Sequence, residues 1–443
     1  MSLRSPARLR VVCPLLERRD DGAWVCSVNA GQVRPFWGRA LLILAGGSLV
    51  SYLLASLLAF GLLRGIGYKV DYVQTLLPGR WGELREVRSR FYLERAAEAR
   101  AAGQPSQALL ALSNAFDLNP RDYATGLLLA QLYQAGQPVW SDGIFTRLYR
   151  EHPERREQTA QTWYRALLAR GDFNAILPVA SNRLLQPEGG RVSSAWTQAF
   201  LFAVRKTGDV AALEKLAASP ELDPSLRRLL QLEQSLPGLS SATRVDALAA
   251  ALDSGTETFA AVHILRRLLD ENRPQLVWNR LAAPGIPIGD REKTRLQLDV
   301  LAKAGNTTDR ARLFRQLLTL PTQPALVEML VSHLVLHPDT ALLRALGDKL
   351  TRDPLPPGEA SYPLLLAWFS ACGAVGDATL ANEAAARLAT ATARDSRALD
   401  YARLALLAAG QGFRVETILP LLQPLPLEVI YALYERYPAP SSS

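Results

Sequence analysis

The chain has 443 residues, of which 49% are hydrophobic and 21% charged, so it is too apolar for a disordered polyelectrolyte and long enough for roughly two to three domains. Three cysteines exclude a disulfide scaffold, and together with four histidines they leave little material for a metal enzyme. The net charge of +8 comes from 50 basic and 42 acidic residues, and half of this excess positive charge lies before Ala40. The remainder is spread too thinly to indicate a nucleic-acid surface.

Residues 1–38 form a basic N-terminal tail with weak signs of a small β-hairpin. Apolar residues alternate on either side of Asp21-Gly22, which is a hairpin turn signal. Cys13 and Cys26 could face each other across such a hairpin. Two thiolates do not complete a four-ligand zinc site, although a dimer could supply the other two. We expect a mostly unstructured tail with reduced thiols.

A transmembrane helix is predicted over 39–64. No charged residue occurs from Ala40 to Leu63, and this run is bracketed by Arg39 and Arg64. At about 1.5 Å per residue the run measures roughly 36 Å, enough to cross a hydrocarbon core of about 30 Å with some tilt. The main alternative is a buried helix of a soluble domain. Such helices seldom run so far without a charge.

The orientation of this span depends on the N-terminal tail. Basic residues close to the two ends of the run nearly balance, but the tail carries seven Lys/Arg, whose export is disfavoured. We therefore place the N-terminus in the cytoplasm and the C-terminal part outside it. Only six of the 50 basic residues are lysine, which suggests a GC-rich bacterial genome. The predicted location is a bacterial inner membrane, with a single pass and a periplasmic C-terminal part.

Small residues recur every four positions inside the span. They are Gly47, Ser51, Ala55 and Ala59. Such a stripe allows a second helix to approach closely and predicts a possible homodimer through the membrane helix. The alternative is that small residues are common in any membrane helix.

After a juxtamembrane linker at 65–90, the sequence from Phe91 is typical of short helices separated by Gly, Pro, Asn and Asp. In residues 96–120, Gly103 ends one helix, small and bulky residues line a second at helical spacing, and Pro120 closes it. The lining residues are Ala108, Leu112 and Ala115. This segment resembles a tetratricopeptide (TPR) repeat, a helix-turn-helix unit of about 34 residues.

The glycines between helices then recur with a similar period. They are Gly103, Gly136, Gly171, Gly208, Gly305, Gly376 and Gly410. Neighbouring members of this series are separated by roughly one, two or three repeat lengths of the TPR type. The resemblance implies an all-α protein, in which an α-solenoid of roughly nine or ten degenerate TPR-like repeats occupies 91–437. Copies beyond about 210 are looser and the pattern is faint between 215 and 300. An irregular all-helical domain is the alternative.

The last helix is predicted to start near Leu427. Its apolar residues fall on one side, and Glu428, Glu435 and Arg436 fall largely on the other. A solenoid must cover its final hydrophobic face, so we expect this helix to pack on 400–422 as a terminal cap. The tail at 438–443 is expected to be disordered.

Motifs for catalysis and for cofactor binding are missing. The sequence has neither a nucleotide-binding glycine loop nor a nucleophile elbow. His333 and His337 have metal-ligand spacing, but the H-E-x-x-H glutamate is missing and Pro338 ends the helix, so we expect ordinary packing. Cys372 is expected to be buried and inert. We predict no enzyme activity, no cofactor and no metal.

What remains is a protein-binding surface. Exposed polar residues on the first helix of each repeat should line the groove of a solenoid. The candidates are Gln131, Gln134, Arg165, Gln198 and Arg205. We expect a membrane-anchored scaffold that binds partner proteins in a bacterial envelope assembly serving secretion, translocation or export. The alternatives are a chaperone-like adaptor for unfolded or emerging polypeptides, which needs an apolar groove, and a regulatory subunit of a membrane enzyme.

Overall fold

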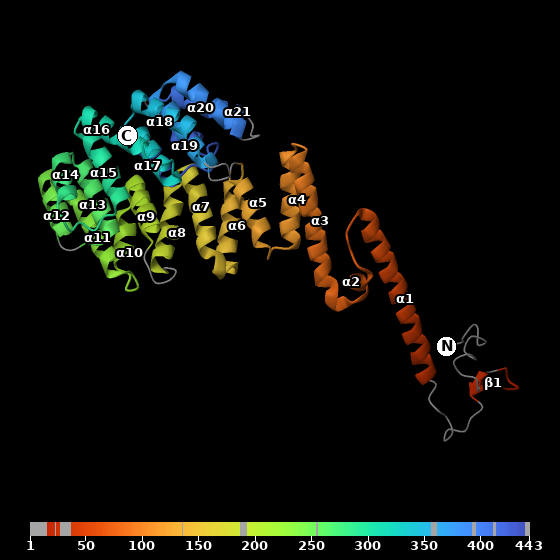
Figure 1. The fold of residues 1–443 in the computed structure, drawn as a ribbon. Helices are drawn as coiled ribbons and strands as arrows, with labels where there is room; N and C mark the ends of the chain where they lie inside the picture. The colour runs from red at the N-terminus through yellow and green to blue at the C-terminus, as the bar shows by residue number, and fades with distance from the viewer. Residues whose placement is uncertain are drawn as a thin grey trace. The chain divides into compact units, whose positions relative to one another are not determined.

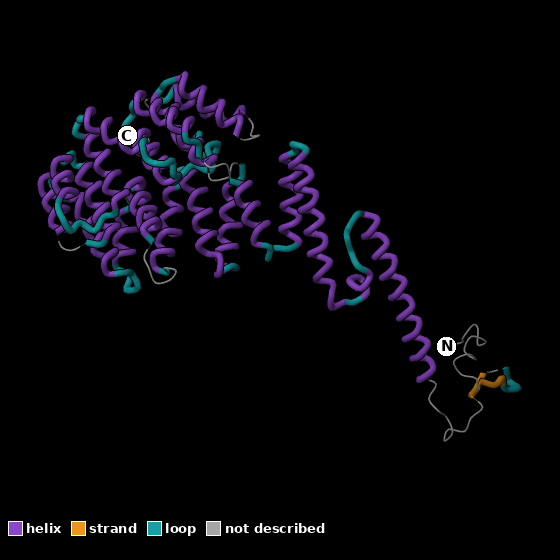
Figure 2. Tube along the Cα trace, viewed as in Figure 1, coloured by secondary structure: helices purple, strands orange, loops and turns teal. Residues whose placement is uncertain are grey.

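The computed structural model describes residues 16–22, 24–26, 37–134, 136–186, 193–253, 256–355, 361–391, 396–410 and 413–438. Within these ranges the chain is all-helical, with 22 α-helices and two short strands (Figures 1 and 2). It divides into two compact units, unit 1 (Met1–Tyr133) and unit 2 (Gln134–Ser443). The all-helical prediction is therefore confirmed.

The described part of the N-terminal tail contains a β-hairpin. Strand β1 (Leu16–Arg18) pairs antiparallel with β2 (Trp24–Cys26), and Leu16 lies opposite Cys26. The turn includes Gly22, whose φ of 83° lies in the left-handed region that glycine enters without strain. The Asp21-Gly22 signal thus marks a turn between paired strands. Cys13, the other thiol considered in the sequence, lies outside the described residues.

Helix α1 (Trp37–Ile66) contains the whole predicted span. It has 30 residues, and nearly all its side chains are exposed, in contrast to a core helix of a soluble protein. By length and composition this helix can cross a membrane. The stripe of Gly47, Ser51, Ala55 and Ala59 is exposed along it, so these positions are open to a second helix.

The segment predicted as a linker is largely structured. Helix α2 (Tyr72–Leu76) folds back on α1: the Tyr72 ring lies edge-on to Phe60 with centroids 5.7 Å apart, and the Tyr52 hydroxyl donates to the Leu76 carbonyl. After the 3-10 turn η3 (Pro78–Arg80), helix α3 (Trp81–Ala101) runs through the boundary expected near 90. The Pro78-Gly79 break ends one element, and no further breaker ends the helix before Gly103.

Helices α3 and α4 (Pro105–Leu118) form the helix pair on which the TPR resemblance depends, and α5 (Tyr123–Tyr133) follows. Gly103 makes the turn with a φ of 70°. Ala108 and Ala115 are buried where the two helices meet, and the Ser89 hydroxyl donates to the Ala115 carbonyl at 2.8 Å. The small residues thus allow the close approach that the sequence predicted.

Replacement of Ala108 by Trp is expected to overpack this contact and to destabilise unit 1 by about 1–3 kcal/mol. Leu110 on the same helix is 65% exposed, so Leu110→Trp is the matched control and should be nearly neutral. Hydrogen exchange of the full chain measures both effects. Equal loss of protection in both units would show that the two units fold as one, and no loss would mean that Ala108 tolerates bulk.

Unit 2 contains seventeen described α-helices, most of which contact the next helix along the chain. They are α6 (Pro138–Glu151), α7 (Arg156–Arg170), α8 (Phe173–Leu185), α9 (Ser194–Thr207), α10 (Val210–Ala217), α11 (Pro224–Ser235), α12 (Ser241–Asp253), α13 (Thr258–Asp270), α14 (Pro274–Ala282), α15 (Asp290–Lys303), α16 (Thr307–Leu318), α17 (Pro324–Leu336), α18 (Thr340–Arg352), α19 (Ser361–Val375), α20 (Ala378–Ala391), α21 (Ser396–Leu407) and α22 (Leu427–Arg436). Short 3-10 turns are η4 (Pro153–Arg155), η6 (Leu236–Gly238) and η7 (Val415–Thr417). Buried side chains from nearly all of these helices join one hydrophobic core.

The expected position of the last helix is wrong. Helix α22 contacts helices far earlier in the chain, most extensively α17, and Tyr437, just after the helix, packs on Phe413 of the predicted segment. The Tyr434 hydroxyl donates to the Leu168 carbonyl at 2.7 Å, and the Tyr164 and Tyr431 hydroxyls are hydrogen-bonded. All six residues of 429–434 are buried, whereas Glu435 is exposed and Glu428 and Arg436 are partly buried. Six consecutive buried residues cover more of the helix than the single apolar face that the sequence predicted.

Candidate functional site: a charged cavity around the C-terminal helix

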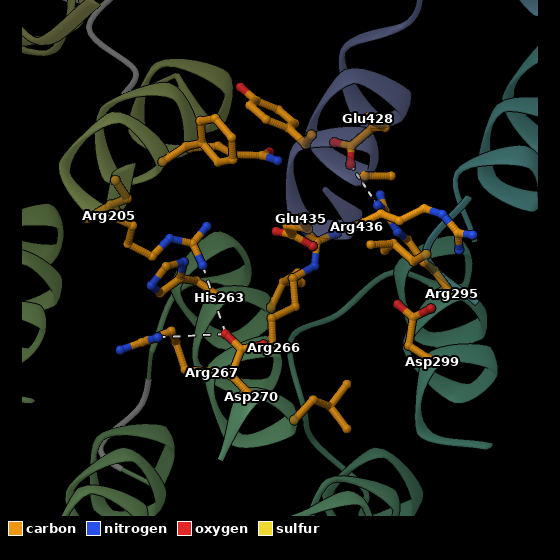
Figure 3. A pocket seen from close by; sticks show the side chains of 18 of the residues that line it. Arg205, His263, Arg266, Arg267, Asp270, Arg295, Asp299, Glu428, Glu435 and Arg436 are labelled. Carbon is orange, nitrogen blue, oxygen red and sulfur yellow. Dashed lines mark ion pairs between the residues drawn. The ribbon is translucent and has the colours of Figure 1, made fainter. Parts of the chain in front are cut away.

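A cavity of about 520 Å³ lies beside α22 and is walled by α9, α13 and α15 (Figure 3). Its lining is dominated by charged side chains of both signs. The basic ones are Arg205, Lys206, Arg266, Arg267, Arg295, Lys303 and Arg436. The acidic ones are Asp270, Asp299, Glu428 and Glu435. The volume is in the range of small-molecule pockets.

Helix α22 supplies the two glutamates of this lining. Glu428 and Glu435 are seven residues apart, which places them two turns apart on one helix face. The sequence pattern predicts that these charged residues lie opposite the apolar face of the helix. The structure directs the charged face into the cavity, opposite basic side chains from the other helices (Figure 3). The seven-residue spacing could have been recognised in the sequence, but the facing arginines could not.

Glu428 forms a largely buried ion pair with Arg295 of α15, at 2.7 Å. Burial alone would raise the pKa of Glu428, but attraction to Arg295 and Arg266 and hydrogen bonds from Arg295 and Gln198 hold that pKa below its usual value. Removal of one partner would leave an uncompensated buried charge, which is strongly destabilising. The pair therefore ties α22 to α15.

Further polar contacts fix α22 and the segment before it. Arg165 of α7 donates to the Leu425 carbonyl at 3.0 Å, and Lys206 of α9 donates to the Tyr434 carbonyl at 3.0 Å. The Arg436 guanidinium donates to the carbonyls of Val335 and Ala374. The carbonyls of Tyr434, Val335 and Ala374 lie in the last turns of α22, α17 and α19, where the helix dipole also favours positive charge.

The five predicted groove residues have different positions. Gln198 and Arg205 both line the cavity, whereas Arg165 is engaged by the Leu425 carbonyl. Gln131 is exposed on α5 in unit 1, and Gln134 is half-buried just after that helix. The structure therefore brings together two of the five. Protein binding by these residues stays a prediction.

On one side of the cavity, Asp270 interacts with two arginines. Its carboxylate lies 3.9 Å from Arg205 and 3.7 Å from Arg267 (Figure 3). Arg267 also lies 3.2 Å from Glu233 of α11, which accepts a hydrogen bond from His263 Nε2 at 2.7 Å. Burial lowers the pKa of His263, so this imidazole resists protonation despite the adjacent carboxylate.

His333 and His337 lie beside Asp299 of α15, which sequence analysis did not connect with them. The candidate ligand atoms of the three residues are all within 4.8 Å of one another, and His333 Nδ1 lies 2.7 Å from the Asp299 carboxylate. Two imidazoles and a carboxylate could hold a divalent metal. However, Arg295, Lys303 and Arg310 add positive charge nearby, which opposes cation binding. We therefore describe the three as a hydrogen-bonded cluster.

Acid is expected to destabilise the protein through His337. Burial, reinforced by His333, Lys303 and Arg310 and opposed by Asp299, lowers the pKa of His337 to about 4. The unfolded chain takes up this proton near pH 6.5 and the folded chain only near pH 4. Stability is therefore retained above about pH 6.5 and falls as the pH decreases to about 4, by up to about 3 kcal/mol.

Denaturant unfolding between pH 4 and pH 7 measures this effect. His337→Asn should reduce the slope of stability against pH relative to the unmodified chain, while the contribution of the buried His263 remains in both. An unchanged slope in the variant would show that His337 titrates normally.

No protein-family model matches the chain, and no curated protein matches it. The fold and the cavity define the class directly: an all-helical protein with a helix long and apolar enough to cross a membrane.

Proposed function

We propose that the chain is a membrane-anchored adaptor of TPR-like helical repeats that binds partner proteins in a bacterial envelope assembly. Its role is binding without catalysis. Two features support this role: the exposed apolar helix α1, and the helix pair α3–α4 with its glycine turn and small residues at the contact. Stacked helix pairs of this kind expose extended surfaces suited to protein recognition.

The observation that carries the proposal is an uncovered apolar surface on α21. Tyr401 is 57% exposed and Leu404 is 58% exposed, and they lie three residues apart on one helix face. Exposed aromatic and aliphatic pairs with a polar surround mark protein interaction sites. We place the partner surface here.

The chaperone-like alternative has weaker support from unit 2. Binding of unfolded polypeptides requires a continuous apolar groove. The cavity beside α22 is instead lined by eleven charged side chains, and six consecutive residues of α22 are buried within the core. A charged surface disfavours nonspecific capture of apolar segments.

Site-specific photo-cross-linking in native membranes tests the proposal. A photoreactive phenylalanine analogue at Tyr401 should give a discrete adduct with one other protein, and the same analogue at exposed Lys215 of α10 should give none. Leu404→Asp should abolish the adduct without loss of membrane association, since Leu404 is exposed. Absence of an adduct at Tyr401, equal adducts at both positions, or an adduct of two copies of this chain would contradict the proposal.

The proposed orientation has its own test. If the N-terminus is cytoplasmic, an alkaline phosphatase fused after residue 438 should be active and a fluorescent protein that matures only in the cytoplasm should be dark. The physical reason is that the seven basic residues of the tail resist export. A bright fluorescent fusion with inactive phosphatase would reverse the topology and move the adaptor role to the cytoplasmic side.

A further inference from the structure

We propose that the cavity beside α22 binds a small organic anion, a molecule with an aromatic or apolar body and at least two negative charges. This site is independent of the protein-binding surface on α21. It would make the body of unit 2 a receptor for a soluble ligand of nucleotide size. Three properties of the cavity support it: unneutralised cations, an apolar wall and a suitable volume.

Positive charge on the lining is not fully neutralised. Among the described residues, Lys206, Lys303 and Arg436 have no carboxylate within 4 Å. Within the described part of the chain, Arg205 reaches only Asp270, at 3.9 Å. Lys206 and Arg436 also donate to backbone carbonyls, so Arg205 and Lys303 have the donors most available to a ligand. Cations without a close carboxylate partner can give an anion charge-assisted hydrogen bonds at little cost in broken ion pairs.

The carboxylates around the cavity do not reverse this balance. Seven basic and four acidic residues line it. Glu233 and Glu292 lie behind Arg267 and Arg266, and Glu416 and Glu328 interact with Lys206 and Arg295, but these four glutamates are not part of the lining. Within the part of the chain that the structure describes, Glu435 makes no ion pair, although Arg205, Arg266 and Lys206 lie near it. Glu435 remains accessible to solvent, and its partial burial raises its pKa. Glu435 is thus the acidic group whose removal should favour an anion.

The remaining wall is apolar and partly aromatic. Phe202, Phe259, Val262 and Leu336 line it beside the charged groups. An inorganic anion would leave this surface in contact with water, whereas a flat organic body would cover it. The volume of about 520 Å³ can hold a mononucleotide-sized molecule. The combination selects an anion with an apolar body over a bare ion.

Calorimetry on the full chain in mild detergent tests the site with three probes. Adenosine 5′-monophosphate carries both required features, inorganic pyrophosphate carries only the charge, and adenosine carries only the flat body. We expect adenosine 5′-monophosphate to bind, pyrophosphate to bind more weakly, and adenosine to show no heat. Binding should weaken as salt is added, since the contacts are ionic.

Paired variants separate the site from general charge effects. Arg205→Gln with Lys303→Gln should weaken nucleotide binding by roughly tenfold or more, because each substitution removes a charged hydrogen-bond donor. Both side chains are substantially exposed, so the fold should survive. Lys215→Gln with Arg312→Gln removes the same charge from exposed positions outside the cavity and should leave affinity unchanged. Glu435→Gln should strengthen binding several-fold.

Arg205→Gln with Lys303→Gln should weaken nucleotide binding and Glu435→Gln should strengthen it, so either result can contradict the proposal. Equal weakening by the control pair would show that binding is nonspecific and would overturn it. So would weaker binding in Glu435→Gln, or no heat with any probe in a chain whose circular dichroism shows intact helices. Binding of an oligoglutamate peptide without binding of the nucleotide would make the cavity a peptide site and would also contradict the inference.

Discussion

Deletion of residues 427–443 is expected to unfold unit 2 as a whole. The deleted segment contains six consecutive buried residues, at 429–434, which pack against α7, α9 and α17. Loss of one buried leucine or isoleucine side chain typically costs about 2–5 kcal/mol, and an entire domain is stable by only about 5–15 kcal/mol. Loss of the whole helix therefore exceeds the stability available.

Hydrogen exchange of the full chain in detergent measures this prediction, with a deletion of 439–443 as the control. A milder version is Leu433→Ala, expected to destabilise unit 2 by about 2–5 kcal/mol, with exposed Leu404→Ala as its matched control. Protection should decrease together in α7 and α17. If it decreased only in residues 396–437, α22 would be a terminal cap after all, and the central position described here would be wrong.

Arginines at Leu53 and Leu54 are expected to release the protein from membranes. Both positions lie near the middle of α1 and their side chains are exposed. Two arginines at the centre of a membrane helix cost roughly 5–7 kcal/mol on the insertion scale. Carbonate extraction distinguishes an integral protein from a peripheral one, and the double variant should appear in the soluble fraction.

The matched control replaces the same two leucines by alanines, which shortens the side chains without adding charge. It should remain in the membrane pellet. If the arginine variant also resisted extraction, the chain would be held by another segment. If the alanine control were released, hydrophobicity at these positions alone would be limiting and the charge argument would not apply.

The sequence predicted correctly those elements whose determinants are local. A long uncharged run between Arg39 and Arg64 is sufficient to indicate α1, and Gly103 between small residues is sufficient to indicate the α3–α4 pair. The start of α3 was placed too late because the charged segment after Pro78-Gly79 was interpreted as a linker. Pro78 and Gly79, which interrupt helices, mark the start of α3 more accurately.

The position of α22 could not be predicted, because its partners are distant in the chain. Tyr431 meets Tyr164, 267 residues away, and Arg436 meets Val335, 101 residues away. Helical periodicity indicates which residues share a face but not what that face meets. The sequence therefore indicates that Glu428 and Glu435 share the charged face, but not that this face meets Arg295 and the other basic side chains of the cavity.

The cavity was unpredictable for a related reason. Its basic residues come from four helices, the first carrying Arg205 and the last carrying Arg436, and no local motif connects them. The His333 and His337 spacing was visible in the sequence, but Asp299, which binds His333, lies on another helix. Isolated arginines on separate helices are indistinguishable from ordinary surface residues until the fold brings them together.

The enclosure of α22 also has a consequence for synthesis on the ribosome. Helices α7 and α22 are joined by the Tyr164–Tyr431 contact across 267 residues. At about 5–20 residues per second, roughly 13–50 s pass between translation of the two tyrosines. During this interval the surfaces of α7, α9 and α17 that receive α22 are without their partner. Nascent chains that stall before residue 427 would display apolar surface, so proteases and chaperones can distinguish incomplete chains from finished ones.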